Sequence, residues 1–274
     1  MRYAMSLSCL GNRVDESLMA ALPHSPLREL ELTLRTIMEE DDSGGSTRQN
    51  LRKLLSSSNA KAISLHLPFG DDWDISVIDE KQRQRIVEKV RRLIEANLEF
   101  GAGQLTLHAS FEPIEAMERT RRVTQVRRSI TELLPTLEPH HLKLAVEWLP
   151  RTCLGNHETE LQELVAGFDR NIIGIILDVN HLMERHRELP QIIACLAPRL
   201  FSLHLSDYDG VDEKHWLPGN GVIDWAAVLA ALQAARLDNL PLIFETGFAP
   251  EQGTPEWHLR QLEKKLLFLK KLER

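Results

Sequence analysis

The sequence predicts an α/β protein whose strands close into a (β/α)8 barrel. The chain has 274 residues, close to the about 250 that such barrels need. Eight short apolar segments alternate with segments of helical period, which favours parallel strands joined by right-handed crossovers. Residues 172–178 are apolar almost throughout, as in a strand buried on both faces. We therefore expect one barrel domain over residues 1–274. The alternative is an open doubly wound sheet, but no Gly-x-Gly-x-x-Gly motif follows the first strand.

Each element is justified by its local pattern. Apolar runs and alternation over four to eight residues indicate strands, at residues 3–8, 27–33, 62–67, 104–108, 142–148, 172–178, 199–204 and 241–246. Apolar residues with a period near 3.6 indicate helices, at residues 15–22, 49–56, 80–100, 114–134, 158–168, 189–196, 224–235 and 255–272. Asp15 can cap the first helix, Gly101 ends the third, and Pro135 lies beyond the fourth.

Composition and charge limit the class of partner. The net charge of −7 opposes nucleic acid as the main partner, because phosphate binding usually needs a basic face. No apolar run approaches the roughly 20 residues of a membrane span, and residues 1–6 lack the apolar core of a signal peptide. Cys9, Cys153 and Cys195 are far apart and odd in number, which is typical of reduced thiols. We expect a cytoplasmic protein without a membrane partner, with a homo-oligomer left open.

Side chains that can bind metal recur at the carboxyl ends of the later strands. They are His66, His108, Glu147, Asp178, His204 and Glu245, with His181 three residues after Asp178. Barrel enzymes keep their active sites at this edge. Carboxylates near the ends of apolar strands are costly to bury unless an opposite charge compensates their negative charge, and a divalent cation can supply that charge. The oxygen-rich donor set favours Mn²⁺, with Zn²⁺, Co²⁺ and Mg²⁺ also compatible.

Each of these residues also has a purely structural interpretation. A lone histidine such as His66 is more often a hydrogen-bonded core residue than a ligand. Glu147 alone could pair with a basic side chain, and Asp178 alone could cap the following turn. Because all six lie at one edge, the metal interpretation is favoured for the set.

The chain resembles the xylose isomerase-like TIM barrels, a family of sugar-phosphate isomerases and epimerases, ketose 3-epimerases, inosose dehydratase, hydroxypyruvate isomerase and endonuclease IV. The resemblance covers essentially the whole chain. The segments that carry it are residues 146–148 (Val-Glu-Trp), 177–181, 202–207, 214–225 and 244–246. It implies a metal-dependent isomerase or epimerase of a sugar, sugar phosphate or polyol, or a related dehydratase.

The resemblance also assigns roles by position. The metal ligands would be Glu147, Asp178, His204 and Glu245. The two glutamates would also be the acid/base pair, acting through a cis-enediolate. The expected substrate-binding residues are His66, His108, His181, Glu213 and His215.

The sequence departs from the ketose 3-epimerases at two positions. Gly210 stands where those enzymes have an arginine, six residues after His204. Cys153 replaces their second substrate-binding glutamate, six residues after Glu147. The substrate clamp of that group is therefore absent in its usual form, and the 3-epimerase substrate is not implied.

An endonuclease IV-like phosphodiesterase acting on abasic DNA is the alternative from another class, and a catalytically inactive sugar-binding relative is a further one. The nuclease's ligands would map onto His66, His108, Glu147, Asp178, His181, His204, Glu213, His215 and Glu245. Asp71, Asp72 and Asp74 would repel DNA phosphates. The loop at residues 41–47 could cradle a phosphate before a helix, but its acids favour a lid or plain loop.

Overall fold

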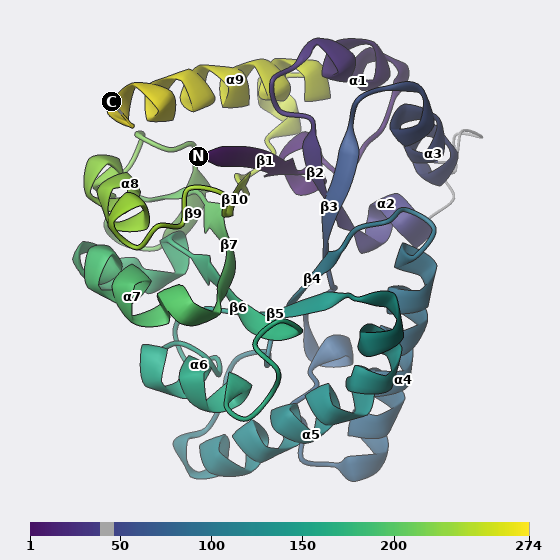
Figure 1. The fold of residues 1–274 in the computed structure, drawn as a ribbon, viewed down its shortest axis with the longest axis vertical. Helices are drawn as coiled ribbons and strands as arrows, with labels where there is room; N and C mark the ends of the chain where they lie inside the picture. Colours follow the sequence, from purple (N-terminus) through teal and green to yellow (C-terminus); the bar gives the residue numbers. More distant parts are fainter. Residues whose placement is uncertain (39–46, 274) are drawn as a thin grey trace.

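The computed structural model describes residues 1–38 and 47–273. Within them, eight parallel strands close into a barrel whose order is β1-β10-β7-β6-β5-β4-β3-β2 (Figure 1). The barrel strands are β1 (Arg2–Ser6), β2 (Glu29–Thr33), β3 (Lys61–His66), β4 (Gln104–Leu107), β5 (Lys143–Glu147), β6 (Ile173–Asp178), β7 (Leu200–Leu205) and β10 (Pro241–Phe244). The predicted barrel is confirmed. The open sheet is excluded because β1 pairs with both β2 and β10.

The helices form an outer ring around the strands (Figure 1). They are α1 (Glu16–Ala21), α2 (Leu34–Met38), α3 (Thr47–Ser57), α4 (Glu80–Asn97), α5 (Arg119–Leu137), α6 (Glu158–Val165), α7 (Leu189–Leu196), α8 (Trp225–Ala234) and α9 (Pro255–Leu272). The predicted cap is present on α1, where the Asp15 side chain accepts a hydrogen bond from the Leu18 backbone N–H. None of the described helices combines the length and apolar character needed to cross a membrane.

Two local predictions differ from the structure, and a third falls mostly on residues that it does not describe. Helix α5 begins at Arg119, later than expected, and contains Pro135 in its last turn, where the missing N–H costs a single hydrogen bond near the helix end. The segment after β7, expected to be a loop, contains the antiparallel pair β8 (Asp207–Tyr208) and β9 (Glu213–Trp216). The polar loop at 41–47 lies outside the described residues except for Thr47, which begins α3.

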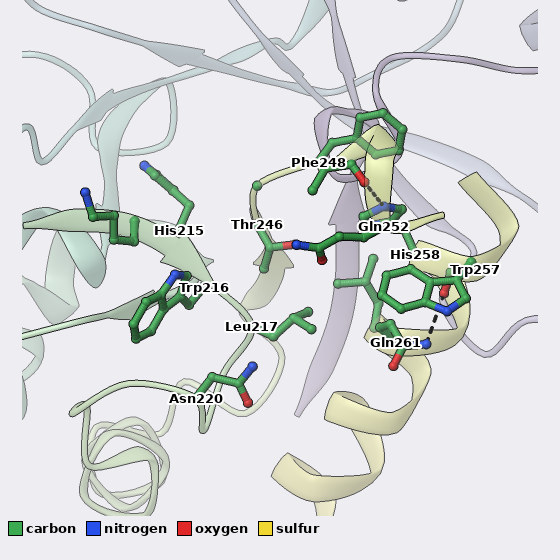
Figure 2. Close-up of a pocket in the computed structure, with 14 residues that line it drawn as sticks. His215, Trp216, Leu217, Asn220, Thr246, Phe248, Gln252, Trp257, His258 and Gln261 are labelled. Carbon is green, nitrogen blue, oxygen red and sulfur yellow. Dashed lines mark hydrogen bonds between the residues drawn. The ribbon is translucent and has the colours of Figure 1, made fainter. Parts of the chain in front are cut away.

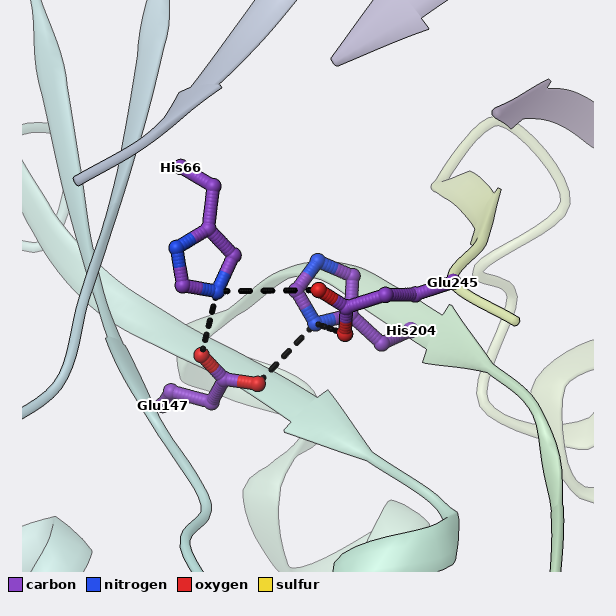
Figure 3. A group of neighbouring side chains, drawn as sticks. All are labelled: His66, Glu147, His204 and Glu245. Carbon is purple, nitrogen blue, oxygen red and sulfur yellow. Dashed lines mark hydrogen bonds and ion pairs between the residues drawn. The ribbon is translucent and has the colours of Figure 1, made fainter. Parts of the chain in front are cut away.

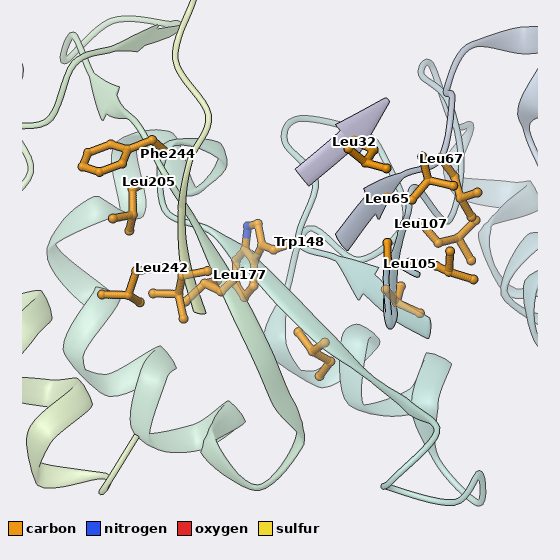
Figure 4. Packing of buried hydrophobic residues seen from close by; sticks show 14 of the residues in the cluster. Leu32, Leu65, Leu67, Leu105, Leu107, Trp148, Leu177, Leu205, Leu242 and Phe244 are labelled. Atoms are coloured by element: carbon orange, nitrogen blue, oxygen red, sulfur yellow. The ribbon is translucent and has the colours of Figure 1, made fainter. Parts of the chain in front are cut away.

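Strand alternation divides the barrel side chains into two sets. Those that point outward pack against the helices and form the main apolar core (Figure 4). A smaller apolar cluster, Ala4, Ala145, Ile176 and Ile243, fills the barrel interior with Phe201 against it. Three of its members lie two residues before Glu147, Asp178 and Glu245 in the sequence. This cluster therefore forms a packed floor beneath the mouth.

The interior positions of β3, β4 and β7 carry hydroxyl groups. Ser64, Thr106 and Ser202 are buried, and each lies two residues before one of the histidines His66, His108 and His204. The barrel interior below the mouth is therefore partly polar, and the hydroxyls of Ser64 and Thr106 donate to a buried carboxylate described below.

Candidate metal centre and active site

The predicted site residues gather at one end of the barrel. His66, Glu147 and Asp178 end β3, β5 and β6, and His204 lies one residue before the end of β7. His108 and Glu245 directly follow β4 and β10. Figure 3 shows His66, Glu147, His204 and Glu245 turned toward one another at the mouth. The edge inferred from the sequence is thus the edge where the side chains meet.

Two carboxylates approach the same imidazole nitrogen. His204 Nδ1 lies 2.8 Å from Glu245 Oε2 and 3.0 Å from Glu147 Oε1. His66 Nε2 lies 3.3 Å from Glu147 Oε2 and 3.7 Å from Glu245 Oε1. One ligand atom from each of these four residues lies within 4.8 Å of the others. The group thus combines three of the predicted metal ligands with His66, which was predicted to bind substrate.

The fourth predicted ligand, Asp178, belongs to an adjoining group with His181 and His215. Its Oδ2 atom is buried and has no hydrogen-bond partner among the described residues. That oxygen lies 3.9 Å from His204 Nδ1 and 3.7 Å from His181 Nε2. An unpaired buried carboxylate oxygen is costly, and a cation at this position would satisfy it. The residues present therefore fit a divalent cation.

Four of the predicted substrate-binding residues line a cavity of about 430 Å³ at the mouth, together with Glu245; they are His108, His181, Glu213 and His215. His66 and Glu147 do not line it and lie beneath it. The His181 ring is oriented by a contact of 2.9 Å between its Nδ1 and the carbonyl of Trp148. Apolar side chains also line the cavity, from Phe69, Phe111, Leu149 and Phe248, and the Phe69 ring stacks on His108 with 4.5 Å between the ring centroids.

Arg151, which the sequence argument did not single out, also lines this cavity. Its guanidinium donates to Glu112 at 3.2 Å, Asp212 at 2.7 Å and Glu213 at 2.9 Å. These partners come from the segment after β4 and from the β8–β9 region, so one side chain joins three loops across the mouth. Sequence position alone gave no signal for this, because its partners are about 40 to 60 residues away.

A second cavity of about 670 Å³ adjoins the first on the α9 side (Figure 2). Trp216 and Trp257 lie on two sides of it with Gln252 between them. The two cavities share a wall that includes His215 and Phe248. The cavity at the mouth thus adjoins a second cavity that is lined by aromatic and amide side chains.

Burial and charge act in opposite directions on the ionisable groups of the site. Burial alone would lower the pKa of His66, but the hydrogen bond and charge of Glu147 raise it to about 9. Burial likewise opposes the charges of Glu245, Glu31 and Glu147, which hold the pKa of His204 well above its usual value. Burial would raise the pKa of Glu245, but the charge and hydrogen bond of His204 lower it.

The remaining carboxylates follow the same logic. Burial would raise the pKa of Glu147, yet the charges of His108 and His204 keep that pKa well below its usual value. For Asp178, burial dominates and raises the pKa. Without a metal ion, protonated imidazoles balance the carboxylates, so binding of a divalent cation would release protons.

The raised pKa of His66 predicts a pH-dependent stability of the metal-free protein. Because the pKa is about 9 when folded and about 6.5 when unfolded, the native state binds more protons between these values. The stabilisation is complete below pH about 6.5 and is lost as the pH rises through about 9.

Urea unfolding in EDTA should show stability falling with pH. His66→Asn should make the slope shallower by up to about 1.4 kcal/mol per pH unit. His140→Asn, at an exposed position, is the control. Equal slopes for His66→Asn and the wild type would contradict the prediction.

Glu31, in the middle of β2, is a site residue that the sequence argument missed. Its side chain is fully buried, and its Oε1 atom lies 3.2 Å from His204 Nε2. Ser64 Oγ and Thr106 Oγ1 donate hydrogen bonds to Oε2 at 2.9 and 3.2 Å. The alternation Leu30-Glu31-Leu32 was an available signal, because it places a carboxylate on the inner face between two outward leucines.

Comparison with known proteins identifies the fold family and several similar proteins. The model of the family described as xylose isomerase-like TIM barrel matches residues 28–272. An inosose isomerase of Bacillus subtilis is 28% identical over 111 residues, which is 38% of this chain and 40% of that protein. The chain spans 62% of an uncharacterized protein of Methanocaldococcus jannaschii at 25% identity, so it covers less than two thirds of these curated relatives.

Two solved structures share the fold over nearly their whole length. A D-psicose 3-epimerase with D-tagatose from Clostridium cellulolyticum is 15% identical, with a TM-score of 0.79 and 100% of each chain covered. The IOLI protein with a binding zinc atom is 18% identical, with a TM-score of 0.75 and 98% of each chain covered. At these identities, the likeness establishes the fold alone.

Proposed function

The chain belongs to the xylose isomerase-like TIM barrel family, and on that premise we propose that it is a divalent-metal-dependent isomerase or epimerase of a sugar, sugar phosphate or polyol. One observation carries the proposal. Two ionised glutamates, Glu147 and Glu245, converge on His204 Nδ1 at a cavity that is lined by Glu245 itself and by three histidines. The inosose isomerase and the 3-epimerase among the similar proteins support the same reaction class.

Glu147, Asp178, His204 and Glu245 would hold the metal ion. Their oxygen-rich donor set favours Mn²⁺, while His66 beside them also suits Zn²⁺ or Co²⁺, and the zinc atom of the IOLI protein supports a divalent ion. When bound, the ion polarises a carbonyl and its neighbouring hydroxyl, which lowers the pKa of the C–H bond between them. Asp178 also belongs to a second donor group with His181 and His215, which could hold a further ion.

The protein's own residues supply the proton transfers. Glu245 lines the cavity, and its lowered pKa keeps it ionised, so it can take the proton from the substrate carbon. The C–H electron pair then forms the C=C bond of an enediolate, and the π pair of the carbonyl moves onto its oxygen, which becomes an oxyanion. Glu147, on another side of His204 Nδ1, is the partner that carries the second proton (Figure 3). Return of the Glu245 proton to the neighbouring carbon, with transfer of that carbon's hydroxyl proton to the oxyanion, gives isomerisation. For epimerisation, Glu147 first takes a proton from solvent and delivers it to the opposite face of the original carbon, and Glu245 then releases its proton to solvent.

The cavity lining fits a polyhydroxylated substrate. His108, His181 and His215 offer hydrogen-bond donors and acceptors, and aromatic rings such as Phe69 supply apolar surface beside them. A few convergent polar groups on an otherwise apolar wall are typical of small-molecule sites. Gly210 and Cys153 remain at the positions where the ketose 3-epimerases have their clamp, so we propose a substrate other than theirs.

Metal analysis and isotope exchange test this proposal together. After loading with Mn²⁺ and removal of excess ion, we expect bound divalent metal, and a lower content in Glu245→Ala. The loaded protein should incorporate solvent tritium into a member of a panel of ketoses, their phosphates and inositol-type ketones. A protein that retains no metal, or that exchanges with no member of the panel, would contradict the proposal.

One observation favours a second candidate, an endonuclease IV-like phosphodiesterase. Asp178, His181 and His215 form a further donor group, with Glu213 Oε2 3.7 Å from His181 Nε2. Several ions at the mouth would suit phosphodiester hydrolysis. The exposed carboxylates Asp71 and Asp72 oppose DNA binding. Incubation with a duplex carrying an abasic site separates the two, because strand cleavage is expected only of the nuclease.

A further inference from the structure

We propose that Glu31 is a positioning residue that fixes the ring of His204 and prepares its Nδ1 atom for the metal ion. The inference rests on the proposed function, since it concerns the same metal site. It assigns a role to a carboxylate that lies below the mouth and touches neither of the cavities described above.

The two nitrogens of the His204 ring face different surroundings. Nδ1 faces the carboxylates of Glu147 and Glu245. Nε2 points into the barrel, where the two oxygens of Glu31 lie 3.2 and 3.4 Å away. Both side chains are fully buried, and Glu31 is the hydrogen-bond partner of Nε2 among the described residues. Its carboxylate therefore decides the orientation of the ring.

Glu31 is itself held in place. The hydroxyls of Ser64 on β3 and Thr106 on β4 donate to its Oε2 atom, and this leaves Oε1 for the closer contact with His204. The support comes from two neighbouring strands of the barrel, so the carboxylate has little freedom to turn. A chain of contacts thus runs from β3 and β4 through Glu31 to the imidazole on β7.

The chemical consequence concerns the tautomer. An imidazole that binds a metal ion through Nδ1 carries its remaining proton on Nε2. A carboxylate that accepts this Nε2–H bond stabilises that tautomer, fixes the ring plane and increases the basicity of Nδ1. Glu31 supplies this acceptor before any metal ion arrives.

Packing alone does not account for a glutamate at this position. The inner positions of other strands are filled by Ala4, Ala145, Ile176 and Ile243, all fully buried and apolar. Burial of a carboxylate costs several kcal/mol in desolvation unless it is fully hydrogen-bonded. The barrel interior could thus be filled without a charge, and the contact with His204 supplies a reason for one.

Two substitutions test the role. Glu31→Leu removes the acceptor, whereas Glu31→Gln keeps an oxygen but loses the charge. Glu29→Gln is the matched control, because Glu29 lies on the same strand, is partly exposed and pairs with Arg2 away from the site. Affinity for Mn²⁺ is measured by competition with a chelator, and the visible spectrum of the Co²⁺-loaded protein reports the ligand field.

We expect Glu31→Leu to bind Mn²⁺ about 10- to 100-fold more weakly, as is usual when the hydrogen-bond partner of a ligating histidine is removed. Glu31→Gln should bind Mn²⁺ only about threefold more weakly than the wild type. It should still shift the Co²⁺ spectrum, because a neutral amide oxygen accepts a weaker hydrogen bond from Nε2–H than a carboxylate does. Glu29→Gln should match the wild type in both measurements.

The outcomes separate the two proposals. A wild-type protein that binds no metal contradicts the proposed function, whereas a wild type that binds metal while Glu31→Leu has the same affinity and Co²⁺ spectrum overturns the role of Glu31. If Glu31→Leu does not fold, Glu31→Gln decides: a Co²⁺ spectrum and Mn²⁺ affinity identical to those of Glu29→Gln overturn the inference.

Discussion

Replacing Glu245 by glutamine is expected to lower the rate of solvent-proton exchange into the substrate by about 10²- to 10⁴-fold. Glu245 lines the mouth cavity, and its interaction with His204 lowers its pKa, so it is ionised at neutral pH. Glutamine has nearly the same size and keeps one oxygen, but it cannot accept the substrate proton. The measurement is tritium uptake per active site, at saturating substrate.

Because Glu245 is also a predicted metal ligand, the comparison is made at saturating Mn²⁺ and with the bound metal quantified. Glu256→Gln, at a partly exposed position on α9 where Glu256 pairs with Arg260, is the matched control and should exchange at the wild-type rate. A Glu245→Gln protein that holds metal and exchanges within threefold of the wild type would show that another group removes the proton.

Replacing Asp207 by alanine is expected to lower the free energy of unfolding by at least about 3 kcal/mol. The Asp207 carboxylate is fully buried and accepts hydrogen bonds from Gly219 N at 2.7 Å, Ile223 N at 3.1 Å and Trp225 Nε1 at 3.0 Å. Alanine leaves these donors without their partner, and each unpaired buried donor costs about 1–3 kcal/mol. Urea denaturation of the metal-free protein gives the value.

Two variants make the comparison specific. Asp207→Asn keeps one carbonyl-type acceptor and should lose less stability than the alanine variant. Asp209→Ala removes a carboxylate two residues away that accepts from the backbone N–H groups of Val211 and Asp212, and it should cost less than about 1 kcal/mol. Equal stabilities for Asp207→Ala and Asp209→Ala would show that the buried Asp207 carboxylate does not stabilise the segment 219–225.

The barrel was predictable because local pattern and topology agree. Each barrel strand was predicted from a short apolar run or alternation, and at 173–178 the continuous apolar run is a strand in which all six residues are buried. The pair β8 and β9 escaped prediction because Asp207–Tyr208 is too short for any period to be visible and depends on contact with Glu213–Trp216. The place of Pro135 in α5 also depends on context, because packing of the helix outweighs one lost hydrogen bond.

The site was predictable as a set but not in its internal pairing. Strand ends gave the positions of Glu147, Asp178 and His204, because parallel strands bring their carboxyl ends together. They could not show that His66 joins the first donor group while Asp178 joins the second, because this depends on side-chain rotamers. Glu31 was not predicted because it lies in the middle of its strand, whereas the prediction rested on residues at the strand ends.

The apolar floor of the barrel bears on the proposed metal site. Ala4, Ala145, Ile176 and Ile243 are fully buried and pack across the barrel interior beneath the mouth. A metal ion seated among Glu147, Asp178, His204 and Glu245 would lie deeper than any molecule in the mouth cavity. Under the proposed function, metal would therefore bind before the substrate and leave after it, and an occupied cavity would lengthen the residence time of the ion.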